Sequence, residues 1–226
     1  MRSITLPFVC LMVSVPAFAQ LKGYQGNVGG TIGIGIPKGE FADTWGRNMF
    51  TWGGHVTMPS RLLPFQWGFA FDYGVMGVKN FTVPVSMPEL TATEGKLAVR
   101  AKVLSYHPLL RFSPFKGKVR PYVDGMAGFR QFTTKSTMSV DGLQEPLLRE
   151  RNANDFALSA GWAGGLMVRL GGIGYVEGRV ERMYSGSASY VDPASIGVDN
   201  AGNLNYQVLE SRTDGVNVLI GVGLRF

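Results

Sequence analysis

Three features of the 226-residue sequence predict an all-β fold, namely an eight-stranded, antiparallel, up-and-down transmembrane β-barrel. Apolar residues recur at every second position in eight separate segments, which is the periodicity of a strand with one apolar face. Glycine is abundant, with 31 residues, whereas charged residues make up only 17%, against about 25% in an average soluble domain. Beyond the N-terminal segment, no apolar run approaches the roughly 20 residues that a membrane helix needs.

The same composition excludes several classes of protein. A chain with 45% hydrophobic residues is not disordered. The single cysteine, Cys10, lies in the N-terminal segment, so the rest of the chain has no disulfide framework. The formal net charge of +6 is spread along the chain without a run rich in Lys or Arg, and we therefore expect no nucleic-acid partner.

The N-terminal residues 1–19 are predicted to be a secretory signal peptide. They combine a basic start with an apolar core that is too short to cross a membrane. Ala17 and Ala19 form a small-x-small cleavage site before Gln20. We expect the remaining residues, 20–226, to form a single barrel domain.

The alternating segments indicate which face of each strand meets which environment. They are 24–36, 49–58, 65–76, 97–103, 119–130, 156–168, 176–184 and 216–226. Their polar faces consist mostly of Gly, Ala, Ser and Thr, which stabilise an exposed sheet poorly but suit the narrow interior of an eight-stranded barrel. Their other faces carry Phe, Trp, Tyr, Ile and Val, which would be an unfavourable surface in water. The apolar faces are therefore predicted to point to lipid and the polar faces to the lumen.

The connections between these segments alternate in length. The shorter ones are 59–64, 108–118 and 169–173, and the longer ones are 37–48, 77–96, 134–155 and 185–214. Barrels of bacterial outer membranes have short periplasmic turns and longer external loops. The even number of strands brings both ends of the chain to one side, and we expect that side to be the periplasm.

The C-terminal residues resemble the assembly signal of bacterial outer-membrane barrels. Gly221, Leu224 and Phe226 match its glycine, alternating apolar residue and terminal aromatic, whereas Leu219 stands where a polar residue is usual. Together with the signal peptide and the eight strands, the sequence resembles the OmpA/OmpX-type superfamily of small eight-stranded barrels. The resemblance implies a location in the outer membrane of a Gram-negative bacterium, contact with its lipids and lipopolysaccharide, and insertion by the barrel assembly machinery.

A set of charged residues is predicted to point into the lumen. These are Arg100, Lys102, Arg120, Asp124, Arg130, Glu177, Arg179 and Glu181. Isolated charges in a narrow interior are costly, so we expect ion pairs across the lumen, with Glu177 and Glu181 against Arg100, Lys102 or Arg179. Such a network is either a structural plug or a salt-bridge gate for small ions.

Catalytic chemistry is only weakly indicated. Some small barrels that this sequence resembles are acyl hydrolases or transferases acting on lipid A, which need a nucleophile beside a base. Ser105 and His107 share a strand face, but at the inner end of the strand, away from the outer leaflet. His55 is expected to be alone in the lumen and to serve packing. No catalytic residue is therefore assigned.

Signals for cofactors and metals are similarly weak. The glycines Gly33, Gly35 and Gly39 lack the following helix that a dinucleotide site needs, and we predict no cofactor. A polar group in the last loop has a spacing that matches no calcium loop and is typical of turns, so no metal site is predicted. Its members are Asp192, Asp199, Asn200 and Asn203.

The preferred function is a non-enzymatic, structural or loop-mediated interaction role in the cell envelope. The external loops carry more apolar residues than solvent exposure requires, which hints at a protein partner. These residues are Leu143, Leu147, Tyr190, Val191, Ile196, Val198 and Tyr206. A narrow gated channel for small ions or solutes and a lipid A-modifying acyl hydrolase are the alternatives.

Overall fold

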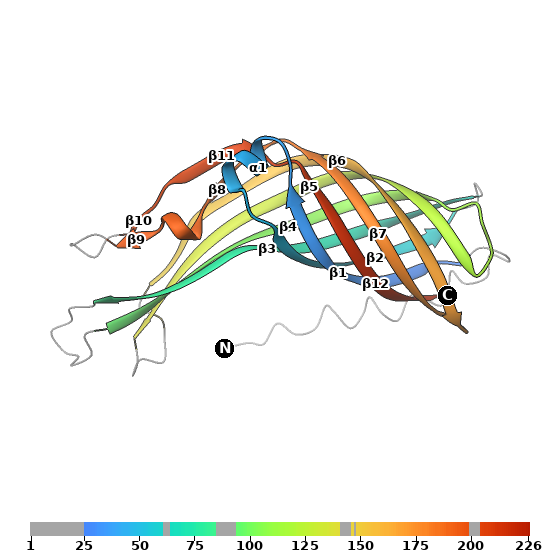
Figure 1. Ribbon diagram of the computed structural model, residues 1–226, viewed down its shortest axis with the longest axis horizontal. Helices are drawn as coiled ribbons and strands as arrows, with labels where there is room; N and C mark the ends of the chain where they lie inside the picture. The colour runs from blue at the N-terminus through green and yellow to red at the C-terminus, as the bar shows by residue number, and fades with distance from the viewer. Residues whose placement is uncertain (1–24, 61–63, 85–93, 141–145, 147, 199–203) are drawn as a thin grey trace, which may run out of the picture.

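The computed structural model describes residues 25–60, 64–84, 94–140, 146, 148–198 and 204–226. Within this part of the chain, eight antiparallel strands close into one barrel in the order β1-β12-β7-β6-β5-β4-β3-β2 (Figure 1). The strands are β1 (Asn27–Pro37), β2 (Met49–Pro59), β3 (Phe65–Pro84), β4 (Glu94–Phe112), β5 (Val119–Val140), β6 (Leu148–Gly171), β7 (Gly174–Ser185) and β12 (Gly215–Arg225). The predicted fold class is confirmed.

The first and last strands close the barrel. β1 pairs with β12 along its whole length, from Asn27 opposite Arg225 to Pro37 opposite Gly215. At the end of this seam the backbone N–H of Phe226 donates to the carbonyl of Gly26 at 3.1 Å. Full closure leaves no open sheet edge in this part of the barrel.

The outer surface of the barrel is apolar. Its exposed side chains include Val28, Ile32, Trp52, Trp67, Val123, Phe156, Leu158, Trp162, Ile220 and Val222. On β5 this surface runs from Val119 to Phe129, which at about 3.3 Å per residue and a tilt of about 40° makes a band about 25 Å tall. That height is the thickness of the apolar band of a membrane barrel. The predicted outward direction of the apolar faces is confirmed within this band.

Four strands are much longer than predicted. β3, β4, β5 and β6 continue past the apolar band and project from one end of the barrel (Figure 1). Most of the predicted loops 77–96 and 134–155 are therefore strand among the residues that the structure describes. We call this extension, residues 77–84, 94–103, 131–140 and 148–155, the projecting sheet.

The polarity of the strand faces inverts on the projecting sheet. Leu97, Val99 and Ala101 point inward and are buried, although the alternation had been interpreted as a lipid-facing row. Arg100 and Lys102 accordingly point outward, so the prediction that they face the lumen is wrong. On β4 the side-chain direction alternates without a break, but beyond the band the inside is a packed core and the outside is solvent. The apolar side therefore changes from the outer to the inner face.

The inner face of the projecting sheet is covered by a folded cap. The cap consists of α1 (Glu40–Trp45), β8 (Ser187–Val191), η2 (Pro193–Ser195), β9 (Gly197–Val198), β10 (Leu204–Asn205) and β11 (Val208–Arg212). β8 pairs with β11, and β9 pairs with β10. No helix among the described residues is long and apolar enough to span a bilayer.

Aromatic residues from distant parts of the chain hold the cap together. Phe41 of α1 packs edge-on against Phe132 of β5 and Tyr190 of β8, with ring centroids 6.1 and 5.5 Å apart. Trp45 packs edge-on against Tyr190 at 6.0 Å. Burial raises the pKa of Tyr190, so its hydroxyl stays neutral and forms a hydrogen bond with the Ser211 hydroxyl at 2.8 Å.

Packing within the chain explains several of the apolar loop residues. Tyr190, Val191 and Ile196 are buried against the projecting sheet, with Leu97 and Val99 among their neighbours. Their apolar character is therefore accounted for without a partner protein. Leu143 and Leu147 lie outside the described residues.

Candidate functional site

The lumen contains a chain of buried ion pairs. Arg111 of β4 donates to both carboxylate oxygens of Asp124 on β5, from Nε to Oδ1 at 2.7 Å and from Nη2 to Oδ2 at 2.9 Å. Arg179 of β7 donates to Asp124 Oδ2 from the other side, and its Nε donates to Glu181 Oε1 at 2.6 Å. Asn217 of β12 completes the chain by donating to Glu181 Oε2 at 2.9 Å. The chain links four strands across the interior, with Asp124 shared by two guanidinium groups.

Tyr122 connects this chain to a second polar cluster. The guanidinium carbon of Arg111 lies 3.8 Å from the centre of the Tyr122 ring, a cation–π contact. The Tyr122 hydroxyl donates to Glu177 Oε2 at 3.0 Å. His55 Nδ1 lies 3.5 Å from Glu177 Oε1, and the hydroxyl of Tyr175 lies 3.4 Å from His55 Nε2. His55 therefore faces the lumen, as predicted, but in contact with a carboxylate rather than alone.

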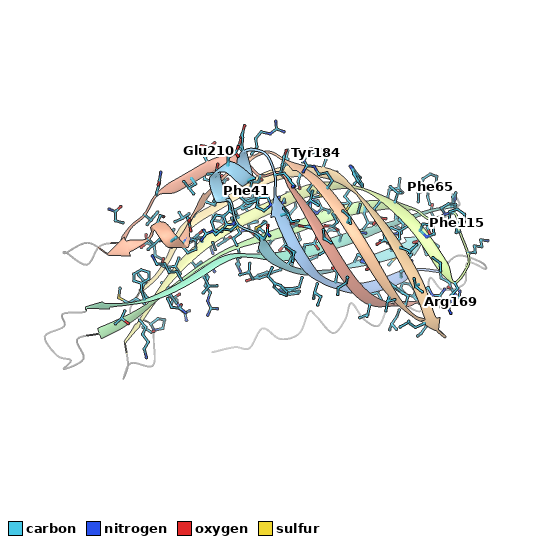
Figure 2. The ribbon with its side chains drawn as sticks, in the orientation of Figure 1. Phe41, Phe65, Phe115, Arg169, Tyr184 and Glu210 are labelled. Carbon is cyan, nitrogen blue, oxygen red and sulfur yellow. The ribbon has the colours of Figure 1, made fainter. Side chains whose placement is uncertain are left out.

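Polar contacts also fill the two ends of the lumen. Arg130 donates from Nη1 to the carbonyl of Thr213 at 2.6 Å, beneath the cap. At the opposite end, Arg120 Nε donates to the carbonyl of Phe115 at 3.1 Å, and Asn27 donates to Gln66 at 3.1 Å. Figure 2 shows Phe115 and Arg169 at this turn end of the molecule and Phe41 and Glu210 at the cap end.

Six of the eight predicted lumen charges are buried inside the barrel: Arg120, Asp124, Arg130, Glu177, Arg179 and Glu181. Glu181 pairs with Arg179, but the two lie on the same strand, β7, and not across the lumen as predicted. Glu177 meets Tyr122 and His55 instead of a guanidinium. Arg111, which is fully buried and bound to Asp124, was not predicted.

Arg111 was missed because the end of the fourth strand was predicted too early. The predicted fourth strand stopped before Pro108, because proline lacks the N–H that a central strand needs. In the structure β4 runs on to Phe112, and between Gly95 and Phe112 its pairing with β5 is interrupted at His107 and Pro108. Arg111 shares the parity of the inward residues Ser105 and His107, and this regular spacing was the signal that could have revealed it.

Two glycines make room for the lumen tyrosines. A Cβ at Gly165 would overlap the ring of Tyr122, and a Cβ at Gly223 would overlap the ring of Tyr175. Each tyrosine ring therefore lies over its directly paired glycine on the neighbouring strand, where any side chain would displace it.

Gly165→Ala is expected to destabilise the barrel by about 1–3 kcal/mol, because it overpacks the site that Tyr122 occupies. Gly125→Ala is the matched control, since its added methyl would meet no atom within 4 Å. Urea unfolding of both variants in detergent measures the difference. Equal midpoints for the two variants would contradict this account.

The candidate nucleophile and base are not paired as the sequence suggested. His107 Nε2 lies 2.7 Å from the hydroxyl of Ser159 on β6, beyond the intervening β5. Both side chains are buried in the lumen, as is Ser105. The site that had been considered for hydrolysis is therefore part of the polar filling of the barrel.

The described residues contain no cluster of three or more His, Cys, Asp or Glu that could hold a metal ion. Asp192 forms an ion pair with Arg47 at 2.6 Å and accepts the N–H of Ala194 at the start of η2. Asp199, Asn200 and Asn203 lie outside the described residues. A short helix, α1, does follow Gly39, contrary to the expectation, but its first turn carries two carboxylates, which disfavour a phosphate.

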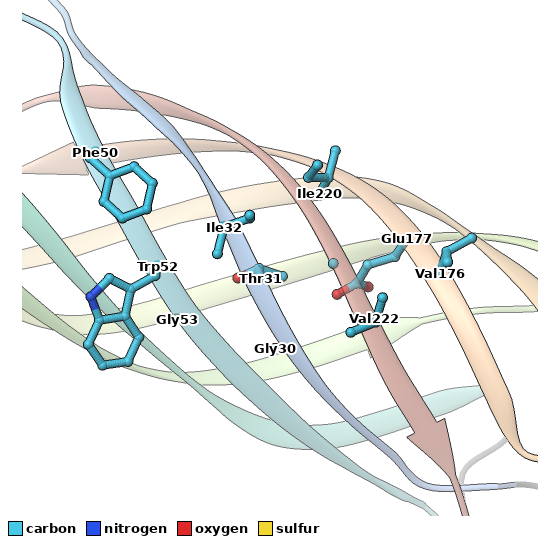
Figure 3. A pocket seen from close by; sticks show the side chains of 11 residues that line it. Gly30, Thr31, Ile32, Phe50, Trp52, Gly53, Val176, Glu177, Ile220 and Val222 are labelled. Atoms are coloured by element: carbon cyan, nitrogen blue, oxygen red, sulfur yellow. The ribbon is translucent and has the colours of Figure 1, made fainter.

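The outer surface of the barrel carries a large apolar groove, shown in Figure 3. Its volume is about 910 Å³, and it lies between β2, β1, β12 and β7. Phe50 and Trp52 form one wall, and Ile220 and Val222 form the other. Gly30 contributes no side chain between these walls, so the groove is a hollow in the lipid-facing surface.

The structure also places the residues of the C-terminal motif. Leu224 is exposed on the outer surface, and Gly221 faces the lumen next to Glu177. The ring of Phe226 lies against Gly26. Recognition of this motif during assembly stays a prediction, as does the signal peptide with Ala17, Ala19 and Gln20, which lies outside the described residues.

A closed barrel with an apolar outer band and a filled, polar interior is the architecture of the small membrane-spanning β-barrels. No protein-family model and no curated protein matches the sequence. Three similar solved structures are those of Neisserial surface protein A, a major outer membrane protein from Thermus thermophilus, and Ail of Yersinia pestis. Their identities to this chain are 9%, 10% and 12%, and their TM-scores are 0.42, 0.45 and 0.37.

Each of these alignments covers 89% of this chain and 97%, 98% and 97% of the respective structure. The likeness at this level concerns the barrel architecture alone.

Proposed function

We propose that this protein is a non-enzymatic barrel of a bacterial outer membrane that holds the projecting sheet and its cap outside the cell as an interaction surface. The observation that carries the proposal is the continuation of β3–β6 beyond the apolar band. On β4 the extension, residues 94–103, corresponds to about 33 Å of strand. A barrel that served only to occupy the membrane would need no more than short hairpin loops at this level.

The orientation follows from the two ends of the barrel. Short connections join β2 to β3, β4 to β5 and β6 to β7, and the strand ends that flank them lie at the same end of the barrel as the C-terminus (Figure 1). The cap and the projecting sheet lie at the other end. Short turns and chain termini are periplasmic in outer-membrane barrels, so the cap end is proposed to face outward.

The filling of the lumen favours this role over the alternatives. Asp124 and Arg179 are buried and link β4, β5 and β7 within the lumen, as expected for a plug. Opening a path for ions would require several buried ion pairs to break together, which is costly. A lipid A hydrolase would need its reactive groups at the outer leaflet, whereas His107 and Ser159 are enclosed.

The test compares two exposed apolar residues at opposite ends of the molecule. Val208→Glu alters the cap surface, and Phe115→Glu alters a periplasmic turn; the two residues are 54% and 56% exposed. After cross-linking in intact cells and extraction in mild detergent, a stoichiometric partner is expected with the wild type and with Phe115→Glu, and in reduced amount with Val208→Glu. A lone wild-type particle that gives discrete conductance steps in a planar bilayer would support the channel instead.

A further inference from the structure

Three basic residues lie side by side across the outer face of the projecting sheet. Arg100 of β4 is directly opposite Lys135 of β5, and Lys135 is directly opposite Arg151 of β6. Adjacent strands are about 4.8 Å apart, and like charges in directly opposed positions destabilise a sheet. A row of three cations is therefore unfavourable in the absence of an anion.

Two more cations extend the row. On β4, Lys102 lies two residues from Arg100 toward the barrel and points the same way. On β6, Arg149 lies two residues from Arg151, away from the barrel, and also points outward. Among the residues that the structure describes, none of the five is ion-paired with a carboxylate. The nearest carboxylate in sequence is that of Glu150, which is half-buried and lies opposite Ser136, an inward-facing residue. We call Arg100, Lys102, Lys135, Arg149 and Arg151 the basic face.

A bulge in β6 contributes to this arrangement. The pairing of β5 with β6 shifts between Thr134 and Lys135, so that no residue of β5 is paired opposite Asn152. The shift reverses which residues of β6 point outward. Without it, Arg151 would share the inward direction of Ala153, and the row would end at Lys135.

The basic face begins where the apolar band ends. On β4 the outward residue next to Lys102 toward the barrel is Leu104, and on β5 the band ends at Phe129. Lys102 extends along the ring of Tyr73, with Nζ 5.5 Å from the ring centre. A basic side chain above an aromatic residue at the edge of an apolar band is typical of the headgroup level of a membrane.

A hollow lies between these cations and could receive a small anion. Its volume is about 390 Å³, and its lining comprises Tyr73, Ala98, Arg100, Lys102, Lys135 and Thr137. Ala98 leaves the space open because its side chain is a single methyl group. The guanidinium of Arg100 and the ammonium groups of the two lysines supply donors for phosphate oxygens, and the Thr137 hydroxyl adds another.

We propose that the basic face binds the phosphate groups of an anionic lipid headgroup in the leaflet on the cap side. This inference rests on the proposed membrane position, because the bilayer brings headgroups to the level of Lys102 and Arg100. The phosphate neutralises the like charges of the row, and the Arg100 guanidinium donates two hydrogen bonds to its oxygens in bidentate geometry. Binding in this way fixes one side of the barrel to a particular lipid.

The test uses purified full-length protein in a neutral detergent and lipid A carrying two phosphates as the probe, with binding followed by native mass spectrometry. The patch variant is Arg100→Gln, Lys135→Gln and Arg151→Gln together. The control, Lys38→Gln with Lys116→Gln and Lys118→Gln, removes the same charge from exposed connections elsewhere. We expect the patch variant to bind about 100-fold more weakly, and the control to bind within about 3-fold of the wild type.

Several outcomes would overturn the proposal. One is equal affinity of the patch variant and the wild type, and another is equal binding of lipid A from which both phosphates have been removed. Competition by inorganic phosphate at low millimolar concentration would identify a free-anion site instead of a headgroup site. Equal affinity for a short oligonucleotide would identify an unselective polyanion surface.

A separate measurement distinguishes failure of the membrane position from failure of the phosphate site. The wild type and both variants should float with vesicles of pure phosphatidylcholine, because insertion depends on the apolar band and not on the basic face. Failure of the wild type to float would reject the proposed function itself. If the triple variant does not fold, Arg100→Gln alone should weaken lipid A binding about 5-fold.

Discussion

Replacing Asp124 with Asn is expected to destabilise the barrel by about 3–5 kcal/mol, because the change leaves two buried guanidinium groups without their shared carboxylate. Arg111 and Arg179 both donate to Asp124, and all three side chains are almost fully shielded from solvent. The neutral amide retains the size of the carboxylate but supplies one acceptor oxygen in place of two. The measurement is the urea midpoint of the folded barrel in detergent, with the shift in gel mobility on boiling as the readout of folding.

Two comparisons isolate the cause. Asp43→Asn removes the same charge from an exposed position on α1 and should change the stability by less than about 0.5 kcal/mol. Adding Arg111→Met to Asp124→Asn removes one of the unpaired cations and should restore part of the loss. Equal stability of Asp124→Asn and the wild type would show that the lumen network does not hold the barrel together.

Replacing Phe41 with Ala is expected to detach the cap while leaving the barrel closed. Phe41 is fully buried between Phe132 and Tyr190, and truncating a buried Phe typically costs about 3–5 kcal/mol. The loss of stability falls on the cap, because the contact of Phe41 with Phe132 joins the cap to the projecting sheet. Limited proteolysis should therefore cut between Gly186 and Asp214 much faster in the variant than in the wild type.

The barrel itself is the internal reference for this experiment. The unboiled gel mobility of Phe41→Ala should match that of the wild type, since the lumen network is unchanged. Phe115→Ala is the matched control: its side chain is 56% exposed at a short turn, and its removal should alter neither proteolysis nor mobility. Unchanged cleavage of Phe41→Ala would mean that other contacts hold the cap.

The barrel could be predicted from the sequence because each strand of a lipid-exposed barrel alternates apolar residues that face lipid with polar or small residues that face the lumen. Alternation in 65–76 and 216–226 gave both the strand and the direction of its faces, and β3 and β12 follow it there. This interpretation of the alternation failed on the projecting sheet, where the outer face no longer meets lipid. Leu97, Val99 and Ala101 show the same alternation as a lipid-facing row, yet they are covered by the cap. Periodicity reports that one face is apolar and not what covers it.

The site was predicted in part for related reasons. Asp124, Arg179 and Glu181 lie in regular alternating segments, so their inward direction followed from parity. The partners were harder to predict because they depend on the relative heights of strands that are not adjacent. Arg111 lies directly opposite Asp124 on the neighbouring strand, but Arg179 reaches it from β7, across the intervening β6.

The three-ring contact at the centre of the cap has a consequence for the order of folding. Phe41 belongs to the first connection, Phe132 to the middle of the chain and Tyr190 to the last connection. These rings can meet only after the loops at both ends of the sequence have crossed to the same side of the membrane. Contacts between such distant residues have a high entropic cost until the intervening chain is ordered. We therefore expect the cap to form only after the connections that carry Phe41 and Tyr190 have both passed to that side.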